Sequence, residues 1–180
     1  MITHVRVEEK GDERGALLSF LEEQRGGIRR ALLGVTEEQA RSRPSAGELS
    51  LGGLLKHVVE GEQSWLARAR QEPPAIRRDA SNWHECFELT DGETVAAQLA
   101  YWAEVAAETE RFIRSAPSLD DTFPVPDQPW FPPEGHVSLR WLCLHLIGET
   151  ARHAGHADIV RESLDGRTAY ELAALEHAAP

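Results

Sequence analysis

Apolar residues recur every three or four positions along four long stretches of the chain, which is the spacing of one buried face of an α-helix. In the first stretch Leu17, Leu21, Ile28 and Leu32 follow this spacing. Strict alternation of apolar and polar residues, the pattern of a half-buried strand, is not convincing anywhere. The expected helices span residues 12–34, 50–71, a third from 90 or 91 to the proline at 117, a fourth at 138–165, and a short one at 168–177.

Local signals set the ends of these helices. Ser50 and Ser138 are the expected N-caps of the second and fourth helices, and Pro73 stops the second. Gly166 supplies the turn after the fourth. Thr36 begins a capping-box pattern for one short extra turn. Four long helices predict an all-α fold, a four-helix bundle with two long connections and a short C-terminal helix.

The two connections, residues 72–90 and 117–137, are longer than simple bundle loops. The second contains six prolines together with Phe123, Trp130 and Phe131. Such a segment either packs as a loop over an exposed end of the bundle or forms the wall of a pocket, and the sequence leaves both interpretations open.

Length and composition indicate one ordinary globular domain over residues 1–180, with 41% hydrophobic residues. The net charge of −11 argues against nucleic acid or an anionic membrane as the main partner. Cys86 and Cys143 form no CxxC pair, and no signal peptide or span of 18 apolar residues is present. The expectation is a cytoplasmic protein that acts on a small molecule.

The fourth helix carries the strongest chemical signal, because His145, Glu149, His153 and His156 share its apolar stripe. A buried carboxylate is costly unless it is paired, protonated or bound to a cation. Residues four apart on a helix are neighbours, so Glu149 and His153 can bind one metal ion. A single core histidine is usually only hydrogen-bonded, but three with a carboxylate favour a metal site.

A third ligand has to come from a neighbouring helix, and His57 at the edge of the apolar stripe of residues 50–71 is the best candidate. His84 and His136 lie in the long connections and fit less well. Glu62, in the middle of the same stripe, either orients a ligand histidine or pairs with an arginine.

Three blocks of sequence resemble a known family. The segments FLEEQRGGIRRALLGVTEEQARSRP, SLGGLLKHVVEGEQSW and LRWLCLHLIGETARHAGHADIVRESLDG resemble the actinobacterial branch of the DinB/YfiT-like superfamily, related to the metal-binding domain of mycothiol-dependent maleylpyruvate isomerase. The resemblance covers roughly residues 12–168, and ETARHAGHADIVRE is its most specific part.

The resemblance implies a four-helix bundle with a central divalent metal held by His57, Glu149 and His153, and use of a low-molecular-weight thiol such as mycothiol. The isomerase has a further C-terminal domain that contributes to its active site, whereas this sequence ends soon after the fourth helix. Maleylpyruvate isomerisation is therefore not expected. The resemblance assigns no role to His145 or His156.

Two histidines and one glutamate leave a coordination position open, as in catalytic zinc sites. The same set suits nickel or non-haem iron, so the sequence does not decide the metal. A zinc-dependent thiol S-transferase is the first hypothesis; the alternatives are a metal-dependent hydrolase and a non-catalytic metal-binding stress protein. A homodimer is left open. Arginines expected to contact an acidic thiol are Arg77, Arg78, Arg152 and Arg161.

Overall fold

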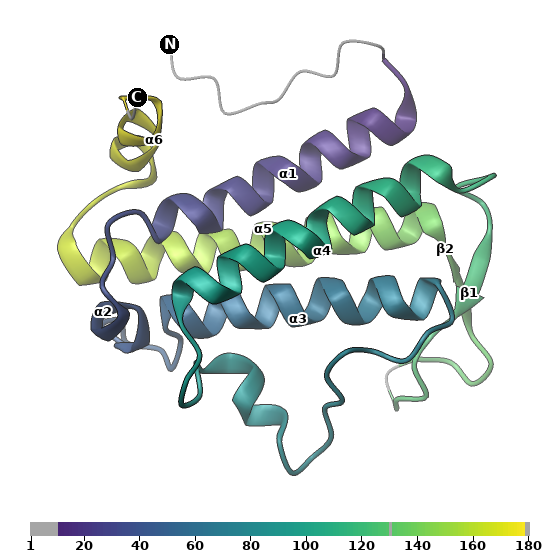
Figure 1. Ribbon diagram of the computed structural model, residues 1–180, viewed down its shortest axis with the longest axis horizontal. Helices are drawn as coiled ribbons and strands as arrows, with labels where there is room; N and C mark the ends of the chain where they lie inside the picture. The colour runs from purple at the N-terminus through teal and green to yellow at the C-terminus, as the bar shows by residue number, and fades with distance from the viewer. Residues whose placement is uncertain (1–10, 130, 179–180) are drawn as a thin grey trace.

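The computed structural model describes residues 11–129 and 131–178, and four long helices form its body (Figure 1). No helix in these residues is both long enough and apolar enough to cross a membrane. The predicted all-α bundle is confirmed. The long helices are α1 (Glu13–Ala31), α3 (Leu51–Ala69), α4 (Val95–Ser115) and α5 (Leu139–Asp165); the short ones are α2 (Glu37–Arg41), η1 (Trp83–Phe87) and α6 (Ala169–Ala178).

The directions of the helices explain why the first connection is long. α3 and α4 run the same way, and α1 and α5 run the opposite way (Figure 1). The chain leaving α3 must therefore return along the whole bundle before α4 can begin. Residues 70–94 make this return beneath α3 and carry η1 on the way.

The expected start of the third helix at Thr90 or Asp91 is wrong. Gly92 has a left-handed φ of 84°, which a helix cannot contain, and the true N-cap is Thr94, whose side chain accepts a hydrogen bond from the Ala97 amide. The first helix ends at Ala31 rather than at residue 34. The predicted caps Ser50 and Ser138 and the capping box at Thr36 are confirmed, as is Gly166, with φ of 77°.

The second connection contains a small antiparallel sheet that the sequence pattern did not predict. β1 (Thr122–Pro124) pairs with β2 (His136–Ser138), and Phe123 lies opposite Val137. Three-residue strands are too short to show a convincing alternation. Phe123 of β1 is buried against residues such as Leu21 and Leu142, whereas Trp130, which belongs to the same connection, lies outside the described residues.

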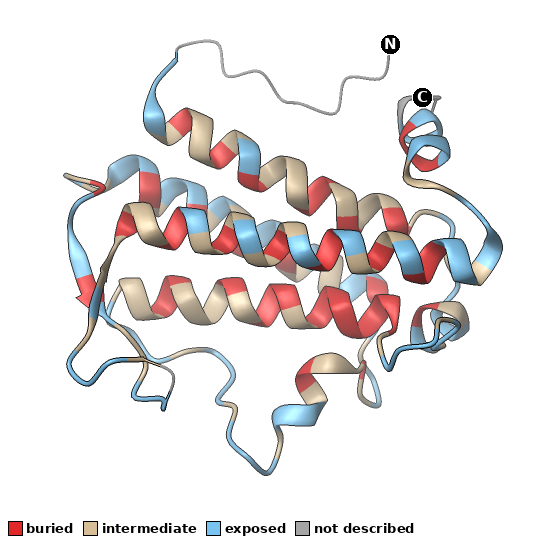
Figure 2. Ribbon diagram, turned by 180° about the vertical axis from the view of Figure 1, so that it is seen from behind, coloured by how far each residue is buried: buried red, intermediate tan, exposed pale blue. Residues whose placement is uncertain are grey.

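The core consists of two apolar clusters separated by a polar layer. One cluster lies near the α2 end and includes Ile28 and Leu54; the other lies near the sheet and includes Leu21 and Leu142. On each long helix a buried polar residue falls between the two, and α3 is the most buried of the helices (Figure 2). The members of this polar layer are Arg25, Glu62, Thr109, Thr150 and His153.

Candidate metal centre

Three predicted ligands from two helices meet in the polar layer. His153 and Glu149 are one turn apart on α5, and their Nε2 and Oε2 atoms are 3.8 Å apart. His57 reaches them from α3, and its ring centroid lies 4.7 Å from that of His153. One ligand atom from each of the three residues lies within 4.8 Å of the others. The helix packing thus brings together residues that are 92 positions apart in the sequence.

The two histidines are held in the protonation state that binds metal. Burial first, and the nearby His153 second, lower the pKa of His57 to about 4. Burial likewise lowers the pKa of His153. Both rings are therefore neutral near pH 7 and offer a lone pair, while Glu149 keeps an exposed edge, with 40% of its side chain accessible.

His156 contacts the nitrogen of the His153 ring that does not face Glu149. Their Nδ1 atoms are 3.4 Å apart, so one nitrogen must donate a proton and the other must accept it. Because Nε2 of His153 faces Glu149, a metal there would need that lone pair, and the proton of His153 would then stay on Nδ1 and point to His156. This contact gives His156 a place beside the site, which sequence reasoning left undecided.

Phe87 forms one wall of the site, and sequence reasoning missed it. Its ring stacks on His57 with centroids 4.2 Å apart. The chain can come this close because of Gly53: a Cβ atom there would lie 1.9 Å from the Phe87 carbonyl oxygen. The signal was present in the Gly52–Gly53 pair one turn before His57, but it could not say which segment approaches.

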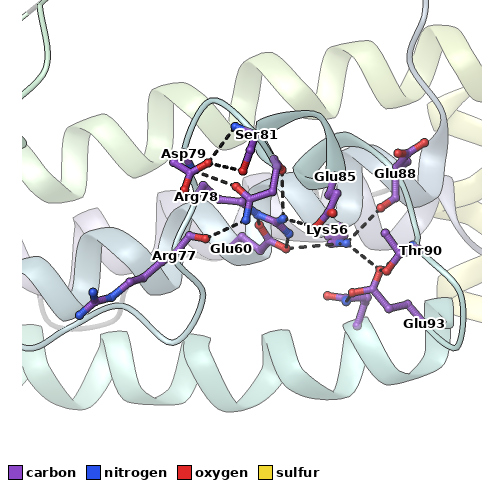
Figure 3. Close-up of polar contacts among 12 residues, drawn as sticks. Lys56, Glu60, Arg77, Arg78, Asp79, Ser81, Glu85, Glu88, Thr90 and Glu93 are labelled. Atoms are coloured by element: carbon purple, nitrogen blue, oxygen red, sulfur yellow. Dashed lines mark hydrogen bonds and ion pairs between the residues drawn. The ribbon is translucent and has the colours of Figure 1, made fainter.

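Ion pairs fasten the returning connection along α3 (Figure 3). Arg78 binds Glu60 through two hydrogen bonds of 2.9 and 2.7 Å. Lys56, almost fully buried, pairs with Glu93 at 2.7 Å and donates to the Glu88 carbonyl at 3.2 Å. The connection is therefore held against α3 at Lys56 and Glu60, on either side of His57, which positions Phe87 against the His57 ring.

An aromatic cluster adjoins the site on the side of the small sheet. Trp65 of α3 touches His145 with centroids 4.7 Å apart and Trp141 at 5.3 Å, both on α5. His145 stacks on Trp141 at 4.7 Å with an interplanar angle of 8°. Phe131 from the second connection closes on Trp65 at 6.1 Å. His145 therefore belongs to this aromatic wall, and the second connection supplies part of it.

Glu62 takes the arginine partner that the sequence offered as one of its two interpretations. Arg25 of α1 binds both of its carboxylate oxygens in a buried ion pair. Trp102 donates to Oε2 at 2.9 Å and Thr109 donates to Oε1 at 2.7 Å. This network ties α1, α3 and α4 together on the face of α3 away from His57.

Of the arginines suggested for binding a thiol, one lies at the site. Arg152 is exposed, and its guanidinium is 3.7 Å from Glu149. Arg161 is buried and donates to the carbonyls of Ala31 and Leu33, so its role is to hold α5 on α1. Arg78 is engaged by Glu60 and Glu85.

The remaining candidate residues lie apart from the three ligands. His84 is exposed in η1, and His136 is exposed in β2 with its Nδ1 atom 3.0 Å from the Glu134 carbonyl oxygen. Cys86 and Cys143 are both buried, and burial raises the pKa of each thiol to about 11. Neither cysteine is a nucleophile near neutral pH.

Two hollows on the described surface lie away from the three ligands. The larger, of about 450 Å³, lies between the start of α1 and the end of α4 and is lined by Arg14 and Arg140. The smaller, of about 250 Å³, lies beside Arg68 and Pro74. The chemistry of the donor set, rather than the size of a cavity, singles out the histidine site.

The residues present fit a divalent ion. Two neutral imidazoles and one carboxylate match the ligand set of open zinc sites, whose bonds are about 2.0–2.2 Å long. A limit of 4.8 Å between donor atoms is wider than their usual spacing around one ion, so the donors must move closer together to bind one, and the 40% exposed side chain of Glu149 has room to rotate. No described residue donates a hydrogen bond to Glu149, so its lone pairs are available.

Comparisons with known proteins agree with this fold. No curated protein matches the chain. A solved structure described as a conserved protein from Enterococcus faecalis has a TM-score of 0.65 at 15% identity, covering 84% of this chain and 96% of that one, which shows the fold alone. A model of the mycothiol-S-transferase family matches residues 16–166. That family is DinB-like, which confirms the resemblance seen in the sequence. Because the match covers most of the chain, this protein belongs to the mycothiol-S-transferase family.

Proposed function

We propose that the chain holds one divalent ion, zinc in the first place, through His57, Glu149 and His153, and uses it to join a low-molecular-weight thiol to a small electrophile. The observation that carries the proposal is the convergence of these three donors within 4.8 Å, in a bundle where the buried carboxylate of Glu62 is fully paired by other residues. A homodimer and a cytoplasmic location remain parts of the proposal.

The chemistry that such an ion supplies is a lowered thiol pKa, so that a thiolate is present near pH 7. The chain itself supplies no such nucleophile among its cysteines, because burial raises the pKa of both thiols to about 11. The nucleophile therefore comes from outside, and membership of the family points to mycothiol.

The proposed reaction conserves atoms and electrons. The thiol releases its proton to solvent, and a sulfur electron pair forms a carbon–sulfur bond. For a halide substrate, the carbon–halogen bond breaks and the halide leaves with the bonding pair. No oxidant or reductant takes part.

The side chains around the donors have separate tasks in this proposal. Phe87 covers the His57 ring on one side, and Trp65 forms an aromatic wall with His145, one turn before Glu149 on α5. His156 holds the proton of His153 on Nδ1. Arg152, exposed beside Glu149, is placed to attract a carboxylate on the incoming thiol.

Metal content tests the ligand assignment. Wild-type protein is expected to carry about one zinc ion per chain by elemental analysis. His153→Ala is expected to remove it, His57→Ala to reduce it strongly, and Glu149→Gln to weaken it, because an amide is a poorer ligand than a carboxylate. His84→Ala, an exposed histidine in η1, is the matched control and should keep the ion. Full metal in a His57/His153 double variant would move the site elsewhere.

Thiol consumption with a model electrophile tests the activity. The zinc-loaded wild type and His84→Ala should consume mycothiol faster than buffer does, and His153→Ala should fall to the buffer rate. Equal rates for wild type and His153→Ala across mycothiol, bacillithiol and glutathione would refute the transferase. The hydrolase or the non-catalytic binding protein would then be the better assignment.

A further inference from the structure

Two rows of side chains face each other across the boundary of α3 and α5. On α5 the row is Trp141, His145, Glu149 and His153, each one turn after the last; on α3 it is His57, Gly61 and Trp65. Ring contacts join the two rows, with centroids 4.7 Å apart for His57 and His153 and 4.7 Å apart for Trp65 and His145. α3 and α5 run in opposite directions (Figure 1), so the two contacts place Gly61, midway between His57 and Trp65, across from Glu149, midway between His153 and His145.

Gly61 leaves a notch in this boundary. A Cβ atom built on it would meet nothing within 4 Å, whereas one on Gly53, two turns earlier, would collide with the Phe87 carbonyl. The φ angle of Gly61 is not positive, so neither backbone conformation nor crowding requires a glycine here. A mid-helix glycine costs about 0.5–1 kcal/mol relative to alanine. Gly148 and Gly155 have equal space but are exposed, whereas Gly61 is half-buried between ring systems.

The notch has an aromatic wall on one side and the donor atoms on the other. Trp65 and the stacked pair His145 and Trp141 form that wall, and each of these rings keeps some exposed surface. Flat rings pack well against such faces, in stacked or edge-on arrangements worth about 0.5–1.5 kcal/mol beyond their buried area. His57 and His153 close the opposite side of the notch.

We propose that the notch over Gly61 is the electrophile subsite and that it selects small aromatic electrophiles of the benzyl halide type. The ring lies against Trp65 and His145, and the carbon that receives the sulfur lies over Gly61, across from Glu149. The inference rests on the proposed transferase function and deepens it by naming the class of electrophile and the glycine that admits it. Filling the notch excludes the ring without replacing a donor residue.

Binding of an unreactive analogue tests the subsite without any turnover. The probe is 4-nitrobenzyl alcohol, followed by saturable quenching of tryptophan fluorescence in the zinc-loaded, thiol-free protein. Gly61→Leu should weaken binding on the order of tenfold or more, because the leucine side chain occupies the notch. Gly61→Ala should weaken it less and should fold normally, since alanine favours the helix. Gly155→Leu, at an exposed glycine of α5 with equal space, is the matched control and should bind as wild type does.

A selectivity measurement completes the test. For the transfer reaction, Gly61→Leu should lower kcat/KM for 4-nitrobenzyl chloride on the order of tenfold while leaving iodoacetamide, a small electrophile without a ring, nearly unchanged. Equal probe affinity in wild type and Gly61→Leu overturns the subsite, whatever the activity. Probe binding that responds to Gly61→Leu but not to Gly155→Leu, in a protein without thiol transfer, supports the subsite and refutes the transferase instead.

Discussion

Glu62 and Glu149 are two carboxylates in the same bundle with opposite surroundings. Glu62 is 3% exposed and receives hydrogen bonds from Arg25, Trp102 and Thr109. Glu149 is 40% exposed at its side chain and has only longer contacts, with Arg152 at 3.7 Å and His153 at 3.8 Å. The protein itself fills the acceptor sites of Glu62, whereas the acceptor sites of Glu149 remain available to a ligand.

The difference in hydrogen bonding separates a carboxylate that stabilises the fold, Glu62, from one that can bind a ligand, Glu149. A buried carboxylate that is fully paired holds helices together and has no lone pair left for a ligand. A carboxylate that is under-paired beside two neutral imidazoles forms an incomplete coordination set. Helical geometry keeps the two apart, because His57 and Glu62 are five residues apart on α3 and therefore lie on different faces.

The largest expected effect on stability follows from breaking the hydrogen-bond network around Glu62. Glu62→Gln should lower the free energy of unfolding by about 3 kcal/mol, because the buried Arg25 then keeps only the more exposed Glu22 as a counter-charge. Glu149→Gln, the matched change at the other carboxylate, should cost the metal-free protein little. Chemical denaturation of both variants measures this. Equal losses of stability in the two variants would contradict the view that Glu62 stabilises the fold and Glu149 does not.

The pH dependence of stability should report the histidine side of the comparison. In metal-free protein the pKa of His57 falls from its ordinary value of 6.5 to about 4 on folding, because the ring is buried. Between these pH values the unfolded chain binds a proton that the folded chain does not, so stability falls as pH falls from about 6.5 to about 4, by up to about 3 kcal/mol.

His57→Gln should remove this part of the decline, and His84→Gln, at the exposed histidine of η1, should preserve it. Denaturant titrations at pH 7, 5.5 and 4 measure both variants. A His57→Gln protein that lost as much stability on acidification as wild type would show that His57 is not held neutral by burial.

The smallest expected effects come from replacing residues that contact the two sites, Thr109 beside Glu62 and His156 beside His153. Thr109→Val removes one hydrogen bond to Glu62 and should cost about 1 kcal/mol of stability without affecting metal content. His156→Leu removes the contact that orients His153 and should weaken zinc binding about 10–100-fold with little change in stability. Zinc titration against a competing chelator, beside thermal unfolding, measures both. The reverse pattern would mean that the two networks are coupled.

The sequence determined the helices and half of the site. Periodic apolar residues, the caps Ser50 and Ser138 and the glycine at 166 act within a few residues of themselves, so their effects can be predicted locally. The spacing of Glu149 and His153 likewise places both on one helical face, whatever the rest of the fold does. At Thr90 the local signal is misleading, because Gly92, two residues later, adopts a left-handed φ of 84° and the helix begins after it.

Only the tertiary structure decided what meets these faces. The stack of Phe87 on His57 depends on a connection that returns along α3 and is held there by Arg78 and Lys56, contacts between residues far apart in the chain. The choice between a ligand-orienting and an arginine-bound Glu62 depended on which helix lies opposite it. Spacing along one helix cannot contain that information, because it fixes the direction of a side chain but not the identity of its neighbour.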